Sequence, residues 1–176
     1  MVGRPAVFID RDGVINRAIV RDGKPYPPST LEEFQILPEV PRAFARLRAA
    51  GFALVVVTNQ PDVAAGKQSR QTVDAMHAVL VRALAPDAVK VCWDRAAPCY
   101  KPKPGLLLEA AAELALDLTA SWMVGDRWRD VDCGHAAGCR TIFIDRGYRE
   151  RLSQIPHFAC ANLAEVADIV LSTRAH

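Results

Sequence analysis

Two apolar runs of this sequence end on acidic side chains. In VFIDRDGVIN the run stops at Asp10, and Asp12 and Gly13 follow. In WMVGDRWRD a later run stops at Asp126, with Asp130 four positions on. A single DRDG could be a strand followed by an Asp/Gly turn, and the second stretch could be a turn with an acid at a helix N-terminus. Polar residues at the ends of the other predicted strands are therefore needed to show whether these acids belong to one site.

A threonine and a lysine stand between the two acidic stretches. VVVTNQ places Thr58 and Asn59 at the end of a third apolar run, and CYKPKPG carries Lys101. Alone, such a threonine can simply end a strand, and a loop lysine is usually solvated. In an open α/β sheet, however, the carboxyl ends of the strands meet at one edge, where ligands bind. The ordered set of acids, threonine and lysine therefore predicts one site there.

The chemistry that this site could perform follows from its acids. Three carboxylates that converge at one edge repel one another unless a cation offsets them. Oxygen ligands of this type suit Mg²⁺, which also binds phosphate. We therefore expect a Mg²⁺-dependent site for a phosphorylated ligand.

The elements that must position these residues alternate along the chain. Near-continuous apolar runs predict strands at residues 6–10, 53–58, 89–93, 122–125 and 141–145, each covered on both faces. Helical patterns lie between or after them: one that Gly51 ends, one that Ser69 caps, Leu106–Leu116, one from Asp126 to near Gly138, and Leu163–Ser172. This alternation predicts an α/β fold, a three-layer α/β/α sandwich around a Rossmann-like parallel sheet.

The length of 176 residues predicts a single domain, residues 1–176. The stretches between Asp12 and Thr58 and between Thr58 and Lys101 are already filled by the predicted loop, helices and strand, so no large cap domain fits. Substrate selection should then fall to the loops at residues 17–38, 61–68 and 94–100, with a neighbouring subunit as a further contributor. We expect a monomer or a small homo-oligomer.

Composition limits the partners of the protein. The formal net charge is only +2, which does not indicate an extended nucleic-acid surface. No apolar run approaches the ~18–20 residues of a membrane span, and the first one is too short for a signal peptide. We therefore expect a cytoplasmic protein with a small-molecule partner.

The motifs DRDG, VVVTNQ, KPKPG and GDRWRD, in this order, resemble the haloacid dehalogenase (HAD) superfamily of phosphohydrolases over roughly residues 6–145. FIDRDGVIN, LPEVPRAFARLRAAGFALVVVTNQ and KPKPG are similar to the subgroup that contains histidinol-phosphate phosphatases and D,D-heptose 1,7-bisphosphate phosphatases. The resemblance implies a phosphomonoesterase of carbohydrate or related metabolism. Its substrate would be a sugar phosphate similar to heptose bisphosphate, or a compound similar to histidinol phosphate.

The resemblance also implies a role for each matching residue. Asp10 would be the nucleophile that forms an aspartyl-phosphate, and Asp12 the general acid and then the general base. Mg²⁺ would be held by the Asp10 carboxylate, the Asp12 backbone carbonyl and Asp126. Thr58 and Lys101 would neutralise the phosphoryl oxygens during transfer.

Three further positions receive a role from the same comparison. Asn59 and Arg127 would contact the substrate, although an exposed arginine is as often a solvated surface charge. Asp130 would orient either Lys101 or a water molecule bound to the metal.

The segment before the lysine departs from the resembling enzymes. Many of them carry a zinc site there, a CxH pair followed by a CxC pair, but this chain reads CWD and APC and keeps only Cys92, Asp94 and Cys99. Because structural zinc takes four ligands, we expect no zinc.

Five cysteines without a CxxC pair predict reduced thiols. Tyr100 replaces an arginine of the heptose enzymes, which argues against heptose bisphosphate as the substrate.

Two other functions share parts of the pattern. Polynucleotide 3′-phosphatases have a similar DxD and TNQ, but the even charge balance of this chain does not favour DNA. A receiver-like signalling domain also combines acids, threonine, lysine and Mg²⁺ on a doubly wound sheet. Its phosphate-accepting aspartate would lie on a central strand, where VVVTNQ offers none.

Overall fold

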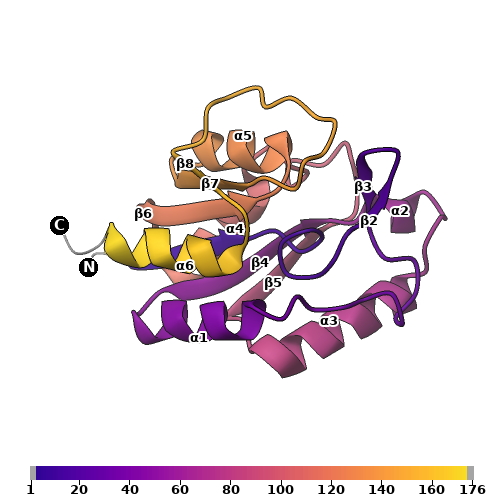
Figure 1. Ribbon diagram of the computed structural model, residues 1–176, viewed down its shortest axis with the longest axis horizontal. Helices are drawn as coiled ribbons and strands as arrows, with labels where there is room; N and C mark the ends of the chain where they lie inside the picture. Colours follow the sequence, from indigo (N-terminus) through magenta and orange to yellow (C-terminus); the bar gives the residue numbers. More distant parts are fainter. Residues whose placement is uncertain (1–2, 174–176) are drawn as a thin grey trace.

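The computed structural model describes residues 3–173, and a six-stranded parallel sheet forms its centre (Figure 1). The strand order is β5-β4-β1-β6-β7-β8, and every neighbouring pair is parallel. The strands are β1 (Arg4–Ile9), β4 (Ala53–Asn59), β5 (Ala88–Cys92), β6 (Leu116–Gly125), β7 (Arg140–Ile144) and β8 (Phe158–Cys160).

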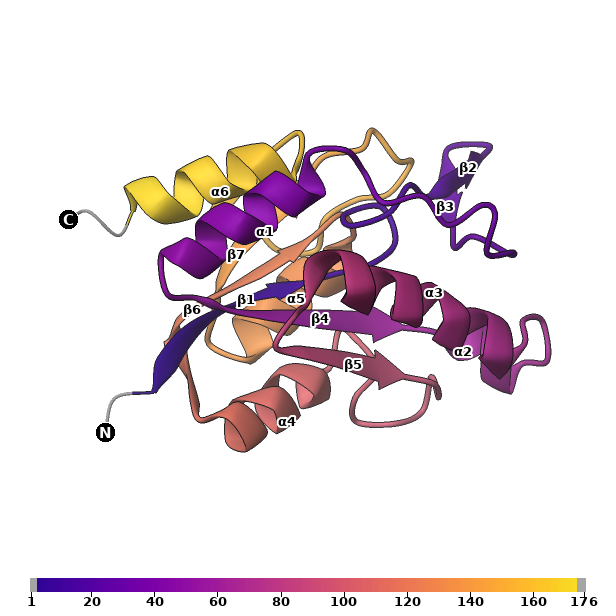
Figure 2. The same cartoon turned by 90° about the horizontal axis from the view of Figure 1, so that it is seen from below.

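Helices cover both faces of this sheet. One face packs against α1 (Val40–Ala49), α3 (Arg70–Leu84) and α6 (Leu163–Ser172), and Figure 2 shows α1 and α6 side by side. The other face packs against α4 (Gly105–Leu114) and α5 (Trp128–Ala136). Alternate residues of the central strands point to the two layers: Val7 and Ile9 to the first, Ala6 and Phe8 to the second. The predicted three-layer α/β/α fold is confirmed.

The helix boundaries follow from local capping chemistry. The Ser69 hydroxyl accepts a hydrogen bond from the Thr72 backbone N–H at the start of α3. At the start of α6 the Asn162 side chain accepts from the Glu165 N–H, while the Glu165 carboxylate accepts from the Ala161 N–H. These side chains satisfy backbone donors that have no partner inside the helix, so they fix where each helix begins.

The prediction of a helix through Leu116 is wrong at its C-terminal end. Ala115 adopts a left-handed conformation (φ 52°), which ends α4 at Leu114, and β6 begins at Leu116. The backbone of Leu116 pairs with Arg4 of β1. Sheet pairing thus overrides the helical pattern at this position.

The sequence did not predict four short elements. The loop at residues 17–38 contains the hairpin of β2 (Ile19–Arg21) and β3 (Lys24–Tyr26), which Figures 1 and 2 show projecting beyond the central sheet, and the third short element is α2 (Pro61–Ala64). The fourth element is the edge strand β8. All are three or four residues long, and β2 and β3 have no buried residue. Such segments carry no apolar periodicity that a sequence reading can detect.

Cys92 and Cys99 form a disulfide, with a Cα–Cα distance of 5.5 Å. The prediction of reduced thiols is therefore wrong for these two residues, while Cys133, Cys139 and Cys160 are free. Cys92 ends β5, and the following loop turns back on itself, so that residues seven positions apart lie within bonding distance. We name residues 93–98, which the disulfide encloses, the disulfide loop.

The sheet register brings the predicted site residues together. Ile9 of β1 pairs with Val56 of β4 on one side and with Val124 of β6 on the other. Asp10 follows Ile9, and Thr58 and Asp126 each lie two positions after the residue paired with Ile9. The three side chains therefore lie at the same carboxyl edge of the sheet. Between residues 3 and 173, no helix is both long enough and apolar enough to cross a membrane.

Candidate active site

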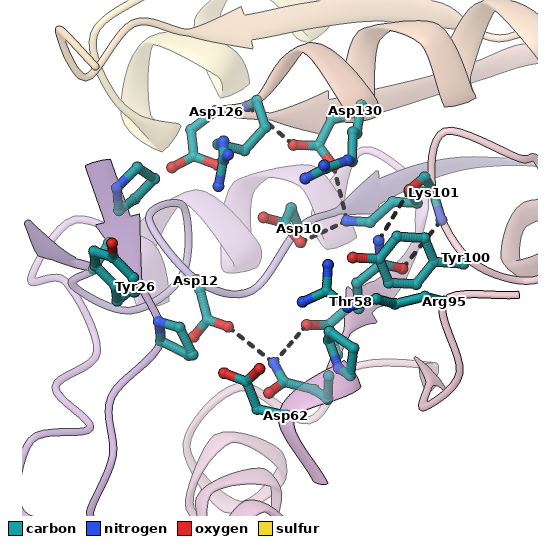
Figure 3. Close-up of a pocket in the computed structure, with 18 of the residues that line it drawn as sticks. Asp10, Asp12, Tyr26, Thr58, Asp62, Arg95, Tyr100, Lys101, Asp126 and Asp130 are labelled. Atoms are coloured by element: carbon teal, nitrogen blue, oxygen red, sulfur yellow. Dashed lines mark hydrogen bonds and ion pairs between the residues drawn. The ribbon is translucent and has the colours of Figure 1, made fainter. Parts of the chain in front are cut away.

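A cavity of about 430 Å³ opens at this edge of the sheet (Figure 3). All the residues to which the sequence assigned a role line it: Asp10, Asp12, Thr58, Asn59, Lys101, Asp126, Arg127 and Asp130. The wall also contains residues from the three loops expected to select the substrate, among them Tyr26, Lys67 and Arg95. The structure thus gathers the whole predicted set into one place.

Lys101 connects two of the acids at the base of the cavity. Its ammonium donates to Asp10 Oδ1 at 2.6 Å, to Asp130 Oδ1 at 2.8 Å and to the Val57 carbonyl at 3.0 Å. The lysine is only 3% exposed, and both carboxylates are buried with it. Of the two alternatives left open for Asp130, the structure shows the contact with Lys101.

Burial and crowding change the proton affinities of these groups. Burial raises the pKa of Asp10 to about 7; Lys101 opposes this rise, and the neighbouring carboxylates of Asp130 and Asp12 add to it. Burial alone would lower the pKa of Lys101, but Asp10 and Asp130 raise it above its usual value. Lys101 therefore stays protonated, and because one cation does not offset all the carboxylates beside it, Asp10 retains its proton to a higher pH than an ordinary aspartate.

Asp126 lies among these groups, and within residues 3–173 no lysine, arginine or histidine forms an ion pair with its carboxylate. Its side chain is buried, and within residues 3–173 neither carboxylate oxygen makes a hydrogen bond that meets ordinary geometric limits. Burial, followed by Asp10 and Asp130, raises the pKa of Asp126 well above its ordinary value, and the hydroxyl of Tyr148 acts against this rise. A buried carboxylate in this state is costly unless a cation binds it.

The glycine after Asp12 makes room for this carboxylate. Gly13 has φ +87°, and a Cβ added there would lie 1.8 Å from Asp126 Oδ2. Any side chain at position 13 would collide with the Asp126 carboxylate, so the fourth position of DRDG must be glycine in this chain.

The side chains present fit a divalent cation. Carboxylate oxygens of Asp10, Asp126 and Asp130 lie within 4.8 Å of one another, and all three residues are buried. Oxygen ligands at this spacing, three acids with one lysine among them, match the requirements of Mg²⁺. The carboxylate of Asp12 is not in this cluster, and the sequence resemblance implies that Asp12 binds the ion through its backbone carbonyl instead.

The Asp12 carboxylate is held by a separate set of donors. Arg11 donates to both oxygens at 2.9 and 3.0 Å, Asn16 donates to Oδ1 at 3.0 Å, and Gln60 donates to Oδ2 at 2.9 Å. Arg11 is fully buried, and His77 Nε2 lies 3.0 Å from its guanidinium. Burial and Arg11 lower the pKa of His77 to about 4, so the neutral imidazole accepts the hydrogen bond.

The residues of VVVTNQ divide between the cavity and its support. Thr58 is buried, and its hydroxyl accepts a hydrogen bond from the Gln60 side chain at 3.0 Å. The Asn59 side chain both donates to the Lys101 carbonyl and accepts from the Lys101 N–H, each at 3.1 Å. Although Asn59 lines the cavity, its amide is thus engaged in fixing the backbone of the lysine.

The residues of GDRWRD are held in a similar way. Asp130 Oδ2 accepts from the Arg127 N–H at 3.1 Å, which fixes the start of α5. The Arg127 guanidinium forms a two-point ion pair with Glu150 and is half-buried. Arg127 is therefore oriented by a carboxylate outside the motif rather than free in solvent.

Sequence reasoning missed several residues that the structure places in or beside the site. Arg11 and Gln60 lie inside the motifs DRD and TNQ, and their position next to predicted residues was the signal available. Tyr148 and Glu150 lie in an irregular segment after β7, where no motif or periodicity marks them. Only the folded chain brings them to Asp126 and Arg127.

Comparison with known proteins agrees with this geometry. The HAD-hydrolase-like family matches residues 98–166. A D-glycero-D-manno-heptose-1,7-bisphosphate 7-phosphatase of Thermosynechococcus vestitus is 35% identical over 168 residues, which cover 85% of this chain and 83% of that protein. The D-glycero-beta-D-manno-heptose-1,7-bisphosphate 7-phosphatase of Escherichia coli K12 is 34% identical, with coverage of 81% and 79%.

A solved structure supports the same relationship. The D,D-heptose 1,7-bisphosphate phosphatase from B. bronchiseptica, complexed with magnesium and phosphate, superposes with a TM-score of 0.78 at 29% identity. The match covers 96% of this chain and 99% of that one. The chain is therefore a member of the HAD superfamily of phosphatases, in the family of the heptose bisphosphate phosphatases.

Proposed function

We propose that this phosphatase hydrolyses a phosphate monoester of a small sugar bisphosphate and requires Mg²⁺. The single observation that carries the proposal is the buried cluster of Asp10, Asp126 and Asp130, in which one lysine offsets part of the negative charge. The names of the relatives support the substrate class, because they specify a heptose bisphosphate. The sequence resemblance implies an arginine at the position of Tyr100 in the heptose enzymes, so the identity of the sugar stays open.

Asp10 begins the reaction. One of its carboxylate oxygens attacks phosphorus, the bond between phosphorus and the sugar oxygen breaks, and an aspartyl-phosphate forms. Asp12 donates its proton to the departing sugar oxygen. Thr58 and Lys101 line the same cavity and stabilise negative charge on the phosphoryl oxygens.

In the second half-reaction Asp12 acts as a general base. Its carboxylate accepts a proton from a water molecule, the water oxygen attacks phosphorus, and the bond between phosphorus and the Asp10 oxygen breaks. Inorganic phosphate leaves and Asp10 is regenerated. The donors on Asp12, namely Arg11, Asn16 and Gln60, hold its side chain in place for both steps.

Mg²⁺, bound by Asp10, Asp126 and the Asp12 carbonyl, would neutralise the phosphoryl group and the nucleophile. Asp130 keeps Lys101 in place through its 2.8 Å contact. Asn59 supports Lys101 from its backbone, and Arg127, which lines the cavity, contacts the substrate.

The proposal is tested by measuring phosphate release. Purified protein should hydrolyse para-nitrophenyl phosphate and members of a sugar-phosphate panel with Mg²⁺, and EDTA should stop the reaction until excess Mg²⁺ is returned. A sugar bisphosphate should give the highest kcat/KM of the panel. Absence of turnover on every compound with Mg²⁺ present would contradict the proposal, as would full activity in EDTA.

A further inference from the structure

Acidic and basic side chains line different depths of the active-site cavity. Its base is acidic, with Asp10, Asp126 and Asp130 around Lys101, and these four residues are buried. Its rim is basic, with the exposed Lys67 and Arg95 and the half-buried Arg129, against the single rim carboxylate of Asp62. A substrate with one phosphate already finds Lys101 and a bound cation at the base. The basic rim therefore indicates a second negative group on the substrate.

Arg95 is the rim cation best placed to bind such a group. Figure 3 shows its side chain running past the Tyr100 ring and pointing into the cavity, and its guanidinium carbon lies 5.9 Å from the centre of that ring. Within residues 3–173 it forms no hydrogen bond or ion pair, whereas Arg127 is held by Glu150. Its fork of N–H donors thus remains available for a phosphate.

The backbone that carries Arg95 is fixed from three directions. The Cys92–Cys99 disulfide closes the disulfide loop at its base. The Lys103 ammonium donates to the carbonyls of Ala96 and Ala97 at 2.9 and 3.1 Å, and Asp94 Oδ1 accepts from the Ala96 N–H at 2.9 Å. A guanidinium on a loop held in this way loses less freedom on binding than one on a mobile loop.

We infer that Arg95, presented by the disulfide loop, is a specificity-determining residue that binds the non-reacting phosphate of a sugar bisphosphate. The inference rests on the proposed function and adds the residue that selects the substrate. The guanidinium of Arg95 reaches the cavity across the Tyr100 ring.

A general attraction of anions by the basic rim makes a different prediction. Long-range steering would raise kcat/KM for every phosphorylated substrate and would fade for all of them as salt is added. Direct binding of a second phosphate favours bisphosphates over monophosphates. The ratio of the two kcat/KM values therefore separates the two explanations.

The experiment compares heptose 1,7-bisphosphate with heptose 7-phosphate, and fructose 1,6-bisphosphate with fructose 6-phosphate, in the wild type and in Arg95→Ala. We expect the wild type to prefer the bisphosphate of at least one pair. Arg95→Ala should reduce that preference by about tenfold, mainly through KM, because a charge-assisted two-point contact is lost. Arg95→Lys should retain part of the preference, since it keeps the charge but not the planar fork.

Arg70→Ala is the matched control. Arg70 stacks on Trp93 of the same loop, with its guanidinium carbon 4.0 Å from the ring centre, but it pairs with Asp74 and does not line the cavity. This variant should keep the wild-type preference. An equal loss on both members of a pair in Arg95→Ala, or a wild type without preference for bisphosphates, would overturn the inference. Failure to hydrolyse even para-nitrophenyl phosphate would instead refute the proposed function.

Discussion

The ammonium of Lys101 lies 2.6 Å from Oδ1 of Asp10, a residue 91 positions away in the chain. The same ammonium contacts Asp130, but Asp126 beside them has no cation of its own. Lys101 therefore pairs with two of the three buried carboxylates, and a bound Mg²⁺ would supply the positive charge that the third lacks.

The two lysines of KPKPG should differ in their effect on catalysis. Lys101→Met removes the cation at the nucleophile, and we expect kcat/KM to fall by about 10²–10³-fold. Lys103→Met removes only donors to the carbonyls of Ala96 and Ala97, so its loss should be at least about tenfold smaller. Steady-state phosphate release measures both. If Lys103→Met is the more damaged variant, the catalytic lysine has been assigned to the wrong position.

Asp126→Asn should lose Mg²⁺ binding and still gain stability in EDTA. The amide removes a buried carboxylate that no cation neutralises in the metal-free protein, so at a pH above the raised pKa of Asp126 we expect a gain of about 1–2 kcal/mol in the free energy of unfolding. Thermal unfolding with EDTA and with Mg²⁺ tests both effects. Mg²⁺ should raise the midpoint of the wild type but not that of the variant. Equal stabilisation of the two proteins by Mg²⁺ would remove Asp126 from the metal site.

The affinity for Mg²⁺ should depend on pH. Burial raises the pKa of Asp10 to about 7 and raises that of Asp126 as well, so in the metal-free protein these groups bind protons below neutral pH. Because Mg²⁺ binds the ionised carboxylates, it must displace those protons, and its dissociation constant should increase by up to about tenfold per pH unit below 7. The part of this dependence that comes from Asp10 should level off above about pH 8.

Calorimetry in two buffers of different ionisation enthalpy can check this coupling. The heat of Mg²⁺ binding at pH 7 should differ between the buffers by the heat of the protons released. A dissociation constant that is the same at pH 6 and pH 8 would show that the carboxylates are already ionised in the metal-free protein.

The oxidised protein should contain three titratable thiols after unfolding, from Cys133, Cys139 and Cys160. A reductant should add two more and lower the free energy of unfolding by about 2–3 kcal/mol, the value expected for a short closed loop. Bound zinc should be far below one atom per chain, because the sulfurs of Cys92 and Cys99 are joined to each other. Stoichiometric zinc lost in Cys92→Ser/Cys99→Ser would contradict this prediction.

Much of the fold and the site could be predicted from local pattern. The five long strands have continuous apolar runs, and the polar residues that end them, such as Asp10 and Thr58, are visible in the sequence. Parallel topology then requires those ends to meet. The end of α4 could not be predicted, because the choice between helix and strand at Leu116 depends on pairing with Arg4, more than a hundred residues away in the chain.

The features that the sequence did not predict depend on how loops fold back on the rest of the chain. The Cys92–Cys99 bridge needs a loop that returns to its start, which spacing alone does not reveal. Tyr148 and Glu150 reach the site only because the segment after β7 folds back over it. Arg95 gave no signal at all, since a single arginine in a loop is ordinary until the cavity beside it is known.

The assignment of Asp10 as the nucleophile is tested most directly by phosphate release from Asp10→Asn. The amide has nearly the same size but cannot supply the attacking oxygen, so turnover should fall by at least about 10³-fold. Circular dichroism and the thermal unfolding midpoint verify that the variant remains folded. The account predicts a folded protein without measurable phosphate release when Mg²⁺ and a sugar bisphosphate are present. Turnover within tenfold of the wild type would contradict it.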